Sequence, residues 1–251
     1  LYYKNLAFEF VPVNPTDPRE IAFTRQPQVP VLQIGDEWRT DSTPLAIWLD
    51  ELFPEKPLFG STEQERESIL ALDSWVTDTL ILAGFRSAYE GEMSAKFRHI
   101  AWRLASIVSS QTPLPDEIRN AWPDLLKTAP FIKHMMCDVD ASESLSEMQA
   151  RIPLQLIENL QGGPFFGGLT EPSLVDFAIF PQVVFNYMVG LDQHLGLTLE
   201  PSLNNWLNNM KPLLPRNPLL VPDFMIISPL VQDSEAQAGR SAQSTSVWGG
   251  S

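Results

Sequence analysis

Asp41 and Ser42 open an amphipathic run near the N-terminus and could together bind the end of a peptide. The free N–H groups at a helix start, with a serine hydroxyl beside them, can hold a carboxylate. The Asp41 carboxylate could meet an ammonium group. A free α-amino acid end carries both a carboxylate and an ammonium group, so it is the ligand that would match this pair. Residues of this kind more commonly serve as a plain N-cap.

Val29 and Pro30 stand directly before a short apolar run. A proline removes one donor from a β ladder, so it belongs at the start or the edge of a strand. If the peptide bond between them is cis, the backbone N–H and C=O of Val29 turn outward and can pair with an extended peptide. A trans bond that simply opens a strand is the commoner state. Taken alone, these residues do not distinguish a ligand site from ordinary strand chemistry.

The residues around these pairs predict a small α/β unit. Short polar and apolar segments alternate with turn residues, and the last segment has helical spacing. The predicted elements are a helix end at Leu1 to Leu6, a strand at residues 7–13, one or two helical turns at Arg19 to Arg25, strands at 29–35 and Glu37 to Thr40 joined by a hairpin turn at Gly35-Asp36, and a helix from Asp41 to Phe53 with Pro44 in its first turn.

The rest of the chain is helical in pattern. Apolar residues recur at three- and four-residue spacing in several segments. The predicted helices cover 65–85, 93–108, 116–136 with interruptions at Pro123 and Pro130, 144–160, 173–189 and 201–214. The predicted domains are a small α/β domain at 1–56, a linker at 57–61, an all-helical domain at 62–230 and a disordered tail at 231–251.

Ser173 and Asp176 have the spacing of a capping box at the start of a very apolar helix. A carboxylate inside such a segment needs backbone N–H donors close by. This pair is therefore predicted to serve folding and not catalysis.

The composition excludes several classes of partner. The formal net charge is −14, with no basic run, so nucleic acid and anionic membrane surfaces would repel the chain. No apolar run is expected to span a bilayer. The single cysteine, Cys137, allows no internal disulfide, and the histidines at 99, 134 and 194 are too far apart to predict a metal site.

Two motifs, one in each half of the chain, resemble the soluble glutathione transferase family. The first is "VPVLQIGDEWRTDSTPLAIWLDELFP", where the family has a Val-Pro before a strand, a hairpin, and an acidic-Ser pair opening a helix. The second is "FFGGLTEPSLVDFAIFP", which is similar to the family's Gly-x-x-x-Ser-x-x-Asp segment in its helical half. The resemblance that they carry extends over most of the chain between Phe8 and Pro215.

The resemblance implies a thioredoxin-like N-terminal domain, here without its first strand and most of its first helix, followed by the family's helical domain. It implies glutathione as co-substrate: the Val29 backbone would pair with the cysteinyl part across a cis Pro30, and Asp41 and Ser42 would hold the γ-glutamyl end. Asp41 stands where glutamate is common in the family, and residues 93–136 are longer than its usual helical hairpin. A small hydrophobic second substrate, a homodimer and a cytoplasmic location also follow by analogy.

The family's activating residue is a Ser, Tyr or Cys in its first strand–helix segment, which is expected to precede Leu1. The catalytic residue is therefore unknown. Tyr2 and Tyr3 are predicted to be packing residues, and Cys137 lies far from the expected thiol position. Two functions stay open: glutathione conjugation or thiol transfer to a small hydrophobic electrophile, and a catalytically inactive binding or structural protein that kept the fold.

Overall fold

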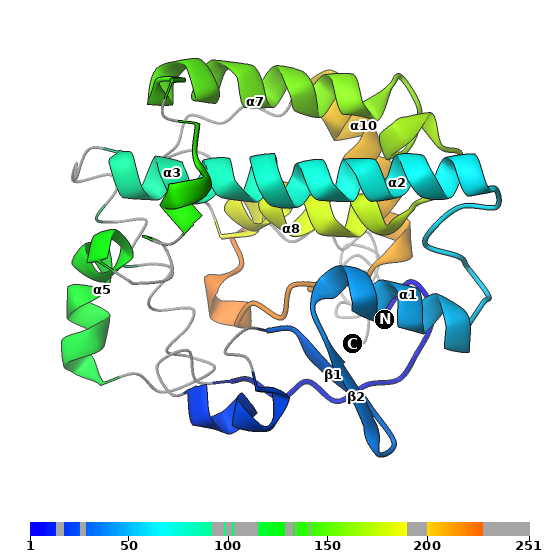
Figure 1. Ribbon diagram of the computed structural model, residues 1–251, viewed down its shortest axis with the longest axis horizontal. Helices are drawn as coiled ribbons and strands as arrows, with labels where there is room; N and C mark the ends of the chain where they lie inside the picture. Colours follow the sequence, from blue (N-terminus) through cyan, green and yellow to red (C-terminus); the bar gives the residue numbers. More distant parts are fainter. Residues whose placement is uncertain are drawn as a thin grey trace, which may run out of the picture.

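The computed structural model of the chain describes residues 1–13, 18–25, 29–91, 115–128, 135–140, 142–189 and 200–227, together with Arg98, Trp102 and Lys133. A small N-terminal unit lies beneath a larger helical unit (Figure 1). The predicted tail at 231–251, the three histidines and nearly all of the predicted helix at 93–108 lie outside the described residues.

The structure confirms most of the elements predicted for the N-terminal unit. It contains the 3-10 helix η1 (Pro18–Thr24), the strands β1 (Val31–Ile34) and β2 (Glu37–Thr40), and the helix α1 (Ser42–Leu52). The strands form an antiparallel hairpin in which Val31 pairs with Thr40 and Ile34 with Glu37. Gly35 takes a positive φ of 60° in the two-residue turn between them, a conformation that glycine adopts at little cost. The buried face of α1 carries Leu45, Ala46, Trp48 and Leu49.

The predicted strand at residues 7–13 is wrong. The sheet of the described residues consists of β1 and β2, and this segment has no place in it. Phe10 and Val11 are exposed there. Alternating side chains are a property of the sequence, whereas a strand also needs a neighbouring backbone to pair with, and the described residues place none beside this segment.

Leu1 to Leu6 has the hydrogen bonds of a helix C-terminus, as predicted. The Leu6 N–H donates to the Leu1 C=O at 3.2 Å, and the Asn5 N–H donates to the Tyr2 C=O at 2.9 Å. Asn5 has a positive φ of 55°. This combination is the Schellman motif, in which asparagine is one of the residues that tolerate the left-handed position.

Lys4 joins this first segment to the C-terminal end of α1 through an ion pair and hydrogen bonds. Its Nζ lies 2.6 Å from Asp50 Oδ1 and donates to the carbonyl oxygens of Phe53 at 2.7 Å and Lys56 at 3.1 Å. The Lys4 side chain is only 2% exposed. A buried ammonium is tolerable because these oxygens, including those at the C-terminal end of α1, replace its water.

The helical unit is built on one long run of three consecutive helices, α2 (Glu63–Trp75), the π-helical segment η2 (Val76–Ile81) and α3 (Leu82–Glu90). Helix α7 lies along one side of this run and α8 along another (Figure 1), and α2 contacts α8 while α3 contacts α7. The other helices are α5 (Asp116–Thr128), η3 (Met136–Asp138), α7 (Leu145–Leu160), η4 (Phe166–Gly168), α8 (Leu174–Met188), α10 (Pro201–Met210), η5 (Lys211–Leu213) and η6 (Asp223–Met225).

Two details of the helical unit differ from prediction. Helix α5 is described over Asp116–Thr128 and continues through Pro123, where an interruption was predicted. Proline removes one backbone hydrogen bond from a helix interior, but α5 remains one continuous helix here despite that loss. The π-helical segment was not predicted, because its wider turn depends on how the helix packs and not on any residue pattern.

The prediction that no run could span a bilayer meets one exception. Residues Glu63–Ser87 form a continuous helix that is long and apolar enough by length and composition alone. It carries Asp73 and packs against α8 and α7, and 22% of its apolar window is buried.

The predicted capping box at the start of α8 forms, and its carboxylate does more than cap. Asp176 is fully buried. Its Oδ2 accepts hydrogen bonds from the Ser173 N–H at 2.8 Å and hydroxyl at 3.2 Å. Its Oδ1 accepts from the Phe166 N–H at 3.0 Å and from Trp206 Nε1 at 2.9 Å. One carboxylate thus joins α8, η4 and α10.

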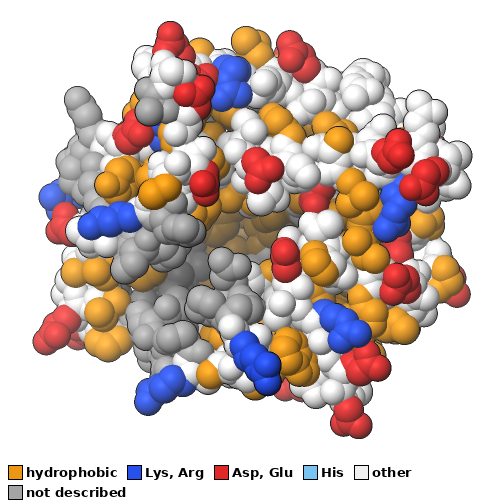
Figure 2. Space-filling model, viewed as in Figure 1, with side chains coloured by type: hydrophobic (Ala, Val, Ile, Leu, Met, Phe, Trp, Pro, Cys, Tyr) orange, Lys and Arg blue, Asp and Glu red, His pale blue; other side chains and the backbone are white. Residues whose placement is uncertain are grey.

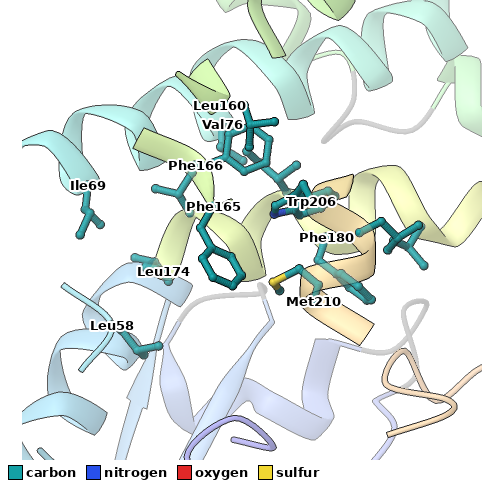
Figure 3. Packing of buried hydrophobic residues seen from close by; sticks show 14 of the residues in the cluster. Leu58, Ile69, Val76, Leu160, Phe165, Phe166, Leu174, Phe180, Trp206 and Met210 are labelled. Carbon is teal, nitrogen blue, oxygen red and sulfur yellow. The ribbon is translucent and has the colours of Figure 1, made fainter. Parts of the chain in front are cut away.

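The main core gathers around these same elements. Trp206 lies among Phe180, Leu160 and Val76, and its ring packs edge-on against Phe166 with centroids 5.2 Å apart (Figure 3). Leu58, from the segment between α1 and α2, reaches this core close to Leu174 (Figure 3). The Leu174 N–H donates to the Leu58 C=O at 2.9 Å. The predicted linker at 57–61 therefore carries core residues.

We expect Asp176→Ala to reduce the free energy of unfolding by about 3 kcal/mol or more, because it leaves three buried N–H donors without an acceptor. Urea unfolding followed by circular dichroism measures this loss. Glu147→Ala, at the matching position of the exposed capping box that starts α7, is the control and should cost much less. Equal losses for both variants would contradict the central role of Asp176.

Candidate functional site

The hairpin brings the two predicted pairs of site residues to one place. Val31 is the first residue of β1 and pairs with Thr40, the last residue of β2. Pro30 precedes the one and Asp41 follows the other, so both lie at the same end of the hairpin. The four predicted site residues, Val29, Pro30, Asp41 and Ser42, are all exposed at this end.

Val29 presents an open backbone at this site. The peptide bond between Val29 and Pro30 is cis. Val29 is 62% exposed and lies outside the β1–β2 ladder, which begins at Val31. Its backbone groups can therefore pair with an extended ligand at the edge of the sheet.

The N-terminus of α1 supplies hydrogen-bond donors to the same site. Asp41 occupies the N-cap position, and its C=O accepts from the Leu45 N–H at 3.0 Å, but its side chain makes no cap hydrogen bond. Pro44 has no N–H. The donors that remain in the first turn are those of Ser42 and Thr43, next to the positive end of the helix dipole.

Asp41 has a strained backbone, with φ 70° and ψ 134°. Few residues other than glycine adopt a positive φ, and this ψ lies outside the usual left-handed region. Such conformations persist where the surrounding structure enforces them and are concentrated at ligand sites. The strain therefore favours a ligand-binding role for Asp41 over that of an ordinary cap.

Asp73 of α2 is a residue of this site that the sequence did not predict. Its Oδ2 accepts a hydrogen bond from Thr43 Oγ1 at 2.5 Å, and the residue is 7% exposed. Its position among Ile69, Leu72 and Val76, within an apolar stretch of α2, was the available signal. A buried carboxylate in such a stretch needs a partner, and the sequence could not identify Thr43, which lies 30 positions away.

The electrostatic setting of Asp73 is unfavourable to its charge. Burial raises the pKa of the Asp73 carboxyl above its ordinary value. The hydrogen bond from Thr43 opposes that shift, and the nearby Asp41 charge adds to it. The N-terminus of α1 is thus bordered by two carboxylates, a setting that suits a ligand with a positive group.

A hollow opens between the two units beside this end of α1 (Figure 2). Hydrophobic side chains line its floor, and a few acidic side chains lie on its upper and right-hand rim (Figure 2).

The predicted packing role of Tyr2 and Tyr3 is confirmed. The Tyr2 ring lies 4.9 Å from Phe8, and the Tyr3 ring lies 5.1 Å from Phe177 of α8. Burial raises the pKa of the Tyr3 phenol, with the charges of Glu171, Asp176 and Asp50 adding to the shift. Tyr3 is therefore neutral at physiological pH.

Cys137 lies in the exposed helix η3, away from this site, and its Sγ is 3.5 Å from the Lys133 carbonyl oxygen. Within the described part of the chain, no three side chains of the metal-ligating types come together.

We expect Asp73→Asn to raise the melting temperature at neutral pH. The raised pKa means that the folded state disfavours the Asp73 charge, so wild-type stability is present below the unfolded pKa and is lost as pH rises through the folded pKa. The gain from the variant should therefore vanish below about pH 4, where Asp73 is neutral in both states. Thermal unfolding across pH measures the difference.

The control for this prediction is Asp78→Asn, which changes an exposed aspartate in the following turn of the same helical run. It should leave the melting temperature at neutral pH close to that of wild type. A melting temperature for Asp73→Asn that stays below wild type at neutral pH would contradict the destabilising effect of this charge.

Comparison with known proteins gives one match in this region. Residues 1–57 match the family model described as the glutathione S-transferase N-terminal domain. No solved structure matches the chain. The matched residues include β1, β2, α1 and the four predicted site residues. Residues 1–57 of this chain are therefore similar to the N-terminal domain of glutathione S-transferases.

Proposed function

We propose that this chain is a glutathione S-transferase-like protein that binds glutathione at the N-terminus of α1. The observation that carries the proposal is the pairing, at one helix end, of free N–H donors with carboxylates. The donors are those of Ser42 and Thr43, the exposed carboxylate is that of Asp41, and the buried Asp73 carboxylate accepts a hydrogen bond from Thr43. Glutathione has a matching end, because its γ-glutamyl residue carries both a free carboxylate and a free ammonium group.

Each half of that end has its own partner in the proposal. The γ-glutamyl carboxylate accepts hydrogen bonds from the Ser42 hydroxyl and from the N–H groups of the first turn, where the helix dipole favours negative charge. The ammonium group lies against the Asp41 carboxylate, and charge-assisted hydrogen bonds of this kind are stronger than neutral ones. The strained and exposed Asp41 supports this assignment.

The cysteinyl part of glutathione would run along the open end of the hairpin. In this proposal its backbone pairs with the N–H and C=O of Val29, with Pro30 beside it, in the manner of a short added strand. The exposure of Val29 and its place outside the ladder support that contact.

The proposed reaction is conjugation or thiol transfer to a small hydrophobic electrophile. Lowering the pKa of the glutathione thiol makes thiolate available at neutral pH, and the thiolate is the nucleophile. The apolar hollow beside α1 supports a hydrophobic second substrate (Figure 2). The residue that activates the thiol stays unassigned: Tyr3 packs near the C-terminal end of α1, about 15 Å of helix from Ser42.

A homodimer and a cytoplasmic location belong to the same proposal, since both are common in the family. The alternative is a protein that binds glutathione on this scaffold without transferring it. No residue is assigned to activate the thiol, and a fold with a ligand site does not by itself supply catalysis. The inactive glutathione-binding protein is therefore the second candidate.

We expect Ser42→Ala to weaken glutathione binding by about 1–3 kcal/mol, the cost of removing a hydrogen bond to a charged group. Isothermal titration calorimetry of the full chain measures the affinity. Ser61→Ala, which removes another exposed hydroxyl ahead of a helix, is the control and should bind as wild type does. Unchanged affinity for Ser42→Ala would refute its assignment, and no binding by wild type would refute the proposed ligand.

We expect the full chain to accelerate the reaction of glutathione with a small aromatic electrophile above the uncatalysed rate. Absorbance of the conjugate measures the rate, and Ser42→Ala should raise the KM for glutathione. Tight glutathione binding without any acceleration, for either conjugation or thiol transfer, would establish the inactive alternative.

A further inference from the structure

The N-terminus of α1 is held against the helical unit at one side-chain hydrogen bond. Thr43, in the first turn of α1, donates to Asp73 of α2 across a gap of 30 positions in sequence. Other contacts between the two units include Ala46 and Ile47, which pack in the main core, the hydrogen bond from the Leu174 N–H to the Leu58 C=O, and Tyr3 packed on Phe177. The Thr43–Asp73 bond is therefore the described contact closest to the candidate ligand site.

This bond takes the place of a missing cap. The Asp41 side chain makes no cap hydrogen bond, and Pro44 cannot contribute an N–H, so the first turn of α1 lacks the usual local support. A helix end without such support frays, and the N–H groups of Ser42 and Thr43 would then point in changing directions. Thr43 is fixed instead from outside, by a carboxylate of the other unit.

The Asp73 carboxylate in this position reduces the stability of the fold. The residue is 7% exposed, and the one hydrogen bond described for its side chain comes from Thr43. A carboxylate buried with so few donors loses hydration that this bond only partly replaces. Residues that reduce stability in this way are characteristic of functional sites, where geometry matters more than stability.

We propose that Asp73 is a positioning residue for the ligand site: through Thr43, it holds the N–H groups at the start of α1 in the orientation that receives the ligand carboxylate. The inference rests on the proposed function, in which that carboxylate is the γ-glutamyl end of glutathione. Asp73 acts through a hydrogen bond, so a substitution that preserves the bond preserves the function.

Four variants separate this role from a purely structural one. Thr43→Val and Asp73→Ala remove the bond, and each should weaken glutathione binding about tenfold, in line with the loss of one buried hydrogen bond. Thr43→Ser keeps the donor and should bind within about twofold of wild type. Asp73→Asn keeps an acceptor oxygen and should recover most of the loss seen with Asp73→Ala.

A double-mutant cycle tests whether the two residues act together. Thr43→Val with Asp73→Ala should bind glutathione no more weakly than either single variant, because both remove the same bond. Calorimetry of the full chain with glutathione measures each affinity. Asp78→Ala, in the exposed part of the following turn, is the control and should bind as wild type does.

Thermal unfolding of each variant verifies that it is folded, and if Asp73→Ala does not fold, Thr43→Val and Thr43→Ser carry the test. Wild-type affinity in Thr43→Val, or additive losses in the double variant, would overturn the positioning role while leaving the glutathione site intact. Equal losses for Asp73→Asn and Asp73→Ala would also overturn it, because charge and not the hydrogen bond would then matter. No glutathione binding by wild type would overturn both the site and this inference.

Discussion

The buried carboxylate of Asp176 is the interaction on which the helical unit depends. Its two oxygens accept hydrogen bonds from Ser173, Phe166 and Trp206, so one side chain fixes the start of α8, the η4 turn and the face of α10. A buried charge is tolerable only when donors replace its water, and here every donor comes from an element that the core must hold in place. Two kinds of contact therefore fix the orientation of Trp206: its indole N–H donates to Asp176, and its ring packs against Phe166 and Phe180.

The N-terminal unit is attached to that core at both ends of α1, by different means. At the C-terminal end, Lys4 forms an ion pair with Asp50 and donates a hydrogen bond to the Phe53 carbonyl oxygen. Just beyond this end, Leu58 packs in the core beside Leu174. Toward the N-terminal end, Thr43 donates a hydrogen bond to Asp73, and Ala46 and Ile47 pack in the main core. The first end is closed by burial, and the second is left open to solvent with its donors exposed. This asymmetry makes one end of α1 structural and leaves the other available to a ligand.

Asp176 and Asp73 show how differently two buried aspartates can be used. Four donors surround Asp176, and its role is complete within the fold. Asp73 has one described donor and a second carboxylate, Asp41, close enough to raise its pKa further. An arrangement of this kind is not explained by stability alone. It becomes reasonable if the charge and the orientation at the start of α1 serve a ligand with both a carboxylate and an ammonium group.

The sequence by itself determined the local elements whose signals are contained in neighbouring residues. The Gly35-Asp36 hairpin, the α1 helix between Asp41 and Phe53, and the Ser173–Asp176 capping box are all short-range patterns, and the structure confirms each. Only the tertiary structure decided what depends on distant partners. Residues 7–13 have a strand's side chains but no backbone to pair with among the described residues, and Asp73 became a site residue because packing set it against Thr43. Turns and caps are stabilised by contacts a few residues apart, whereas ladders and buried ion sites require groups that only the folded chain brings together.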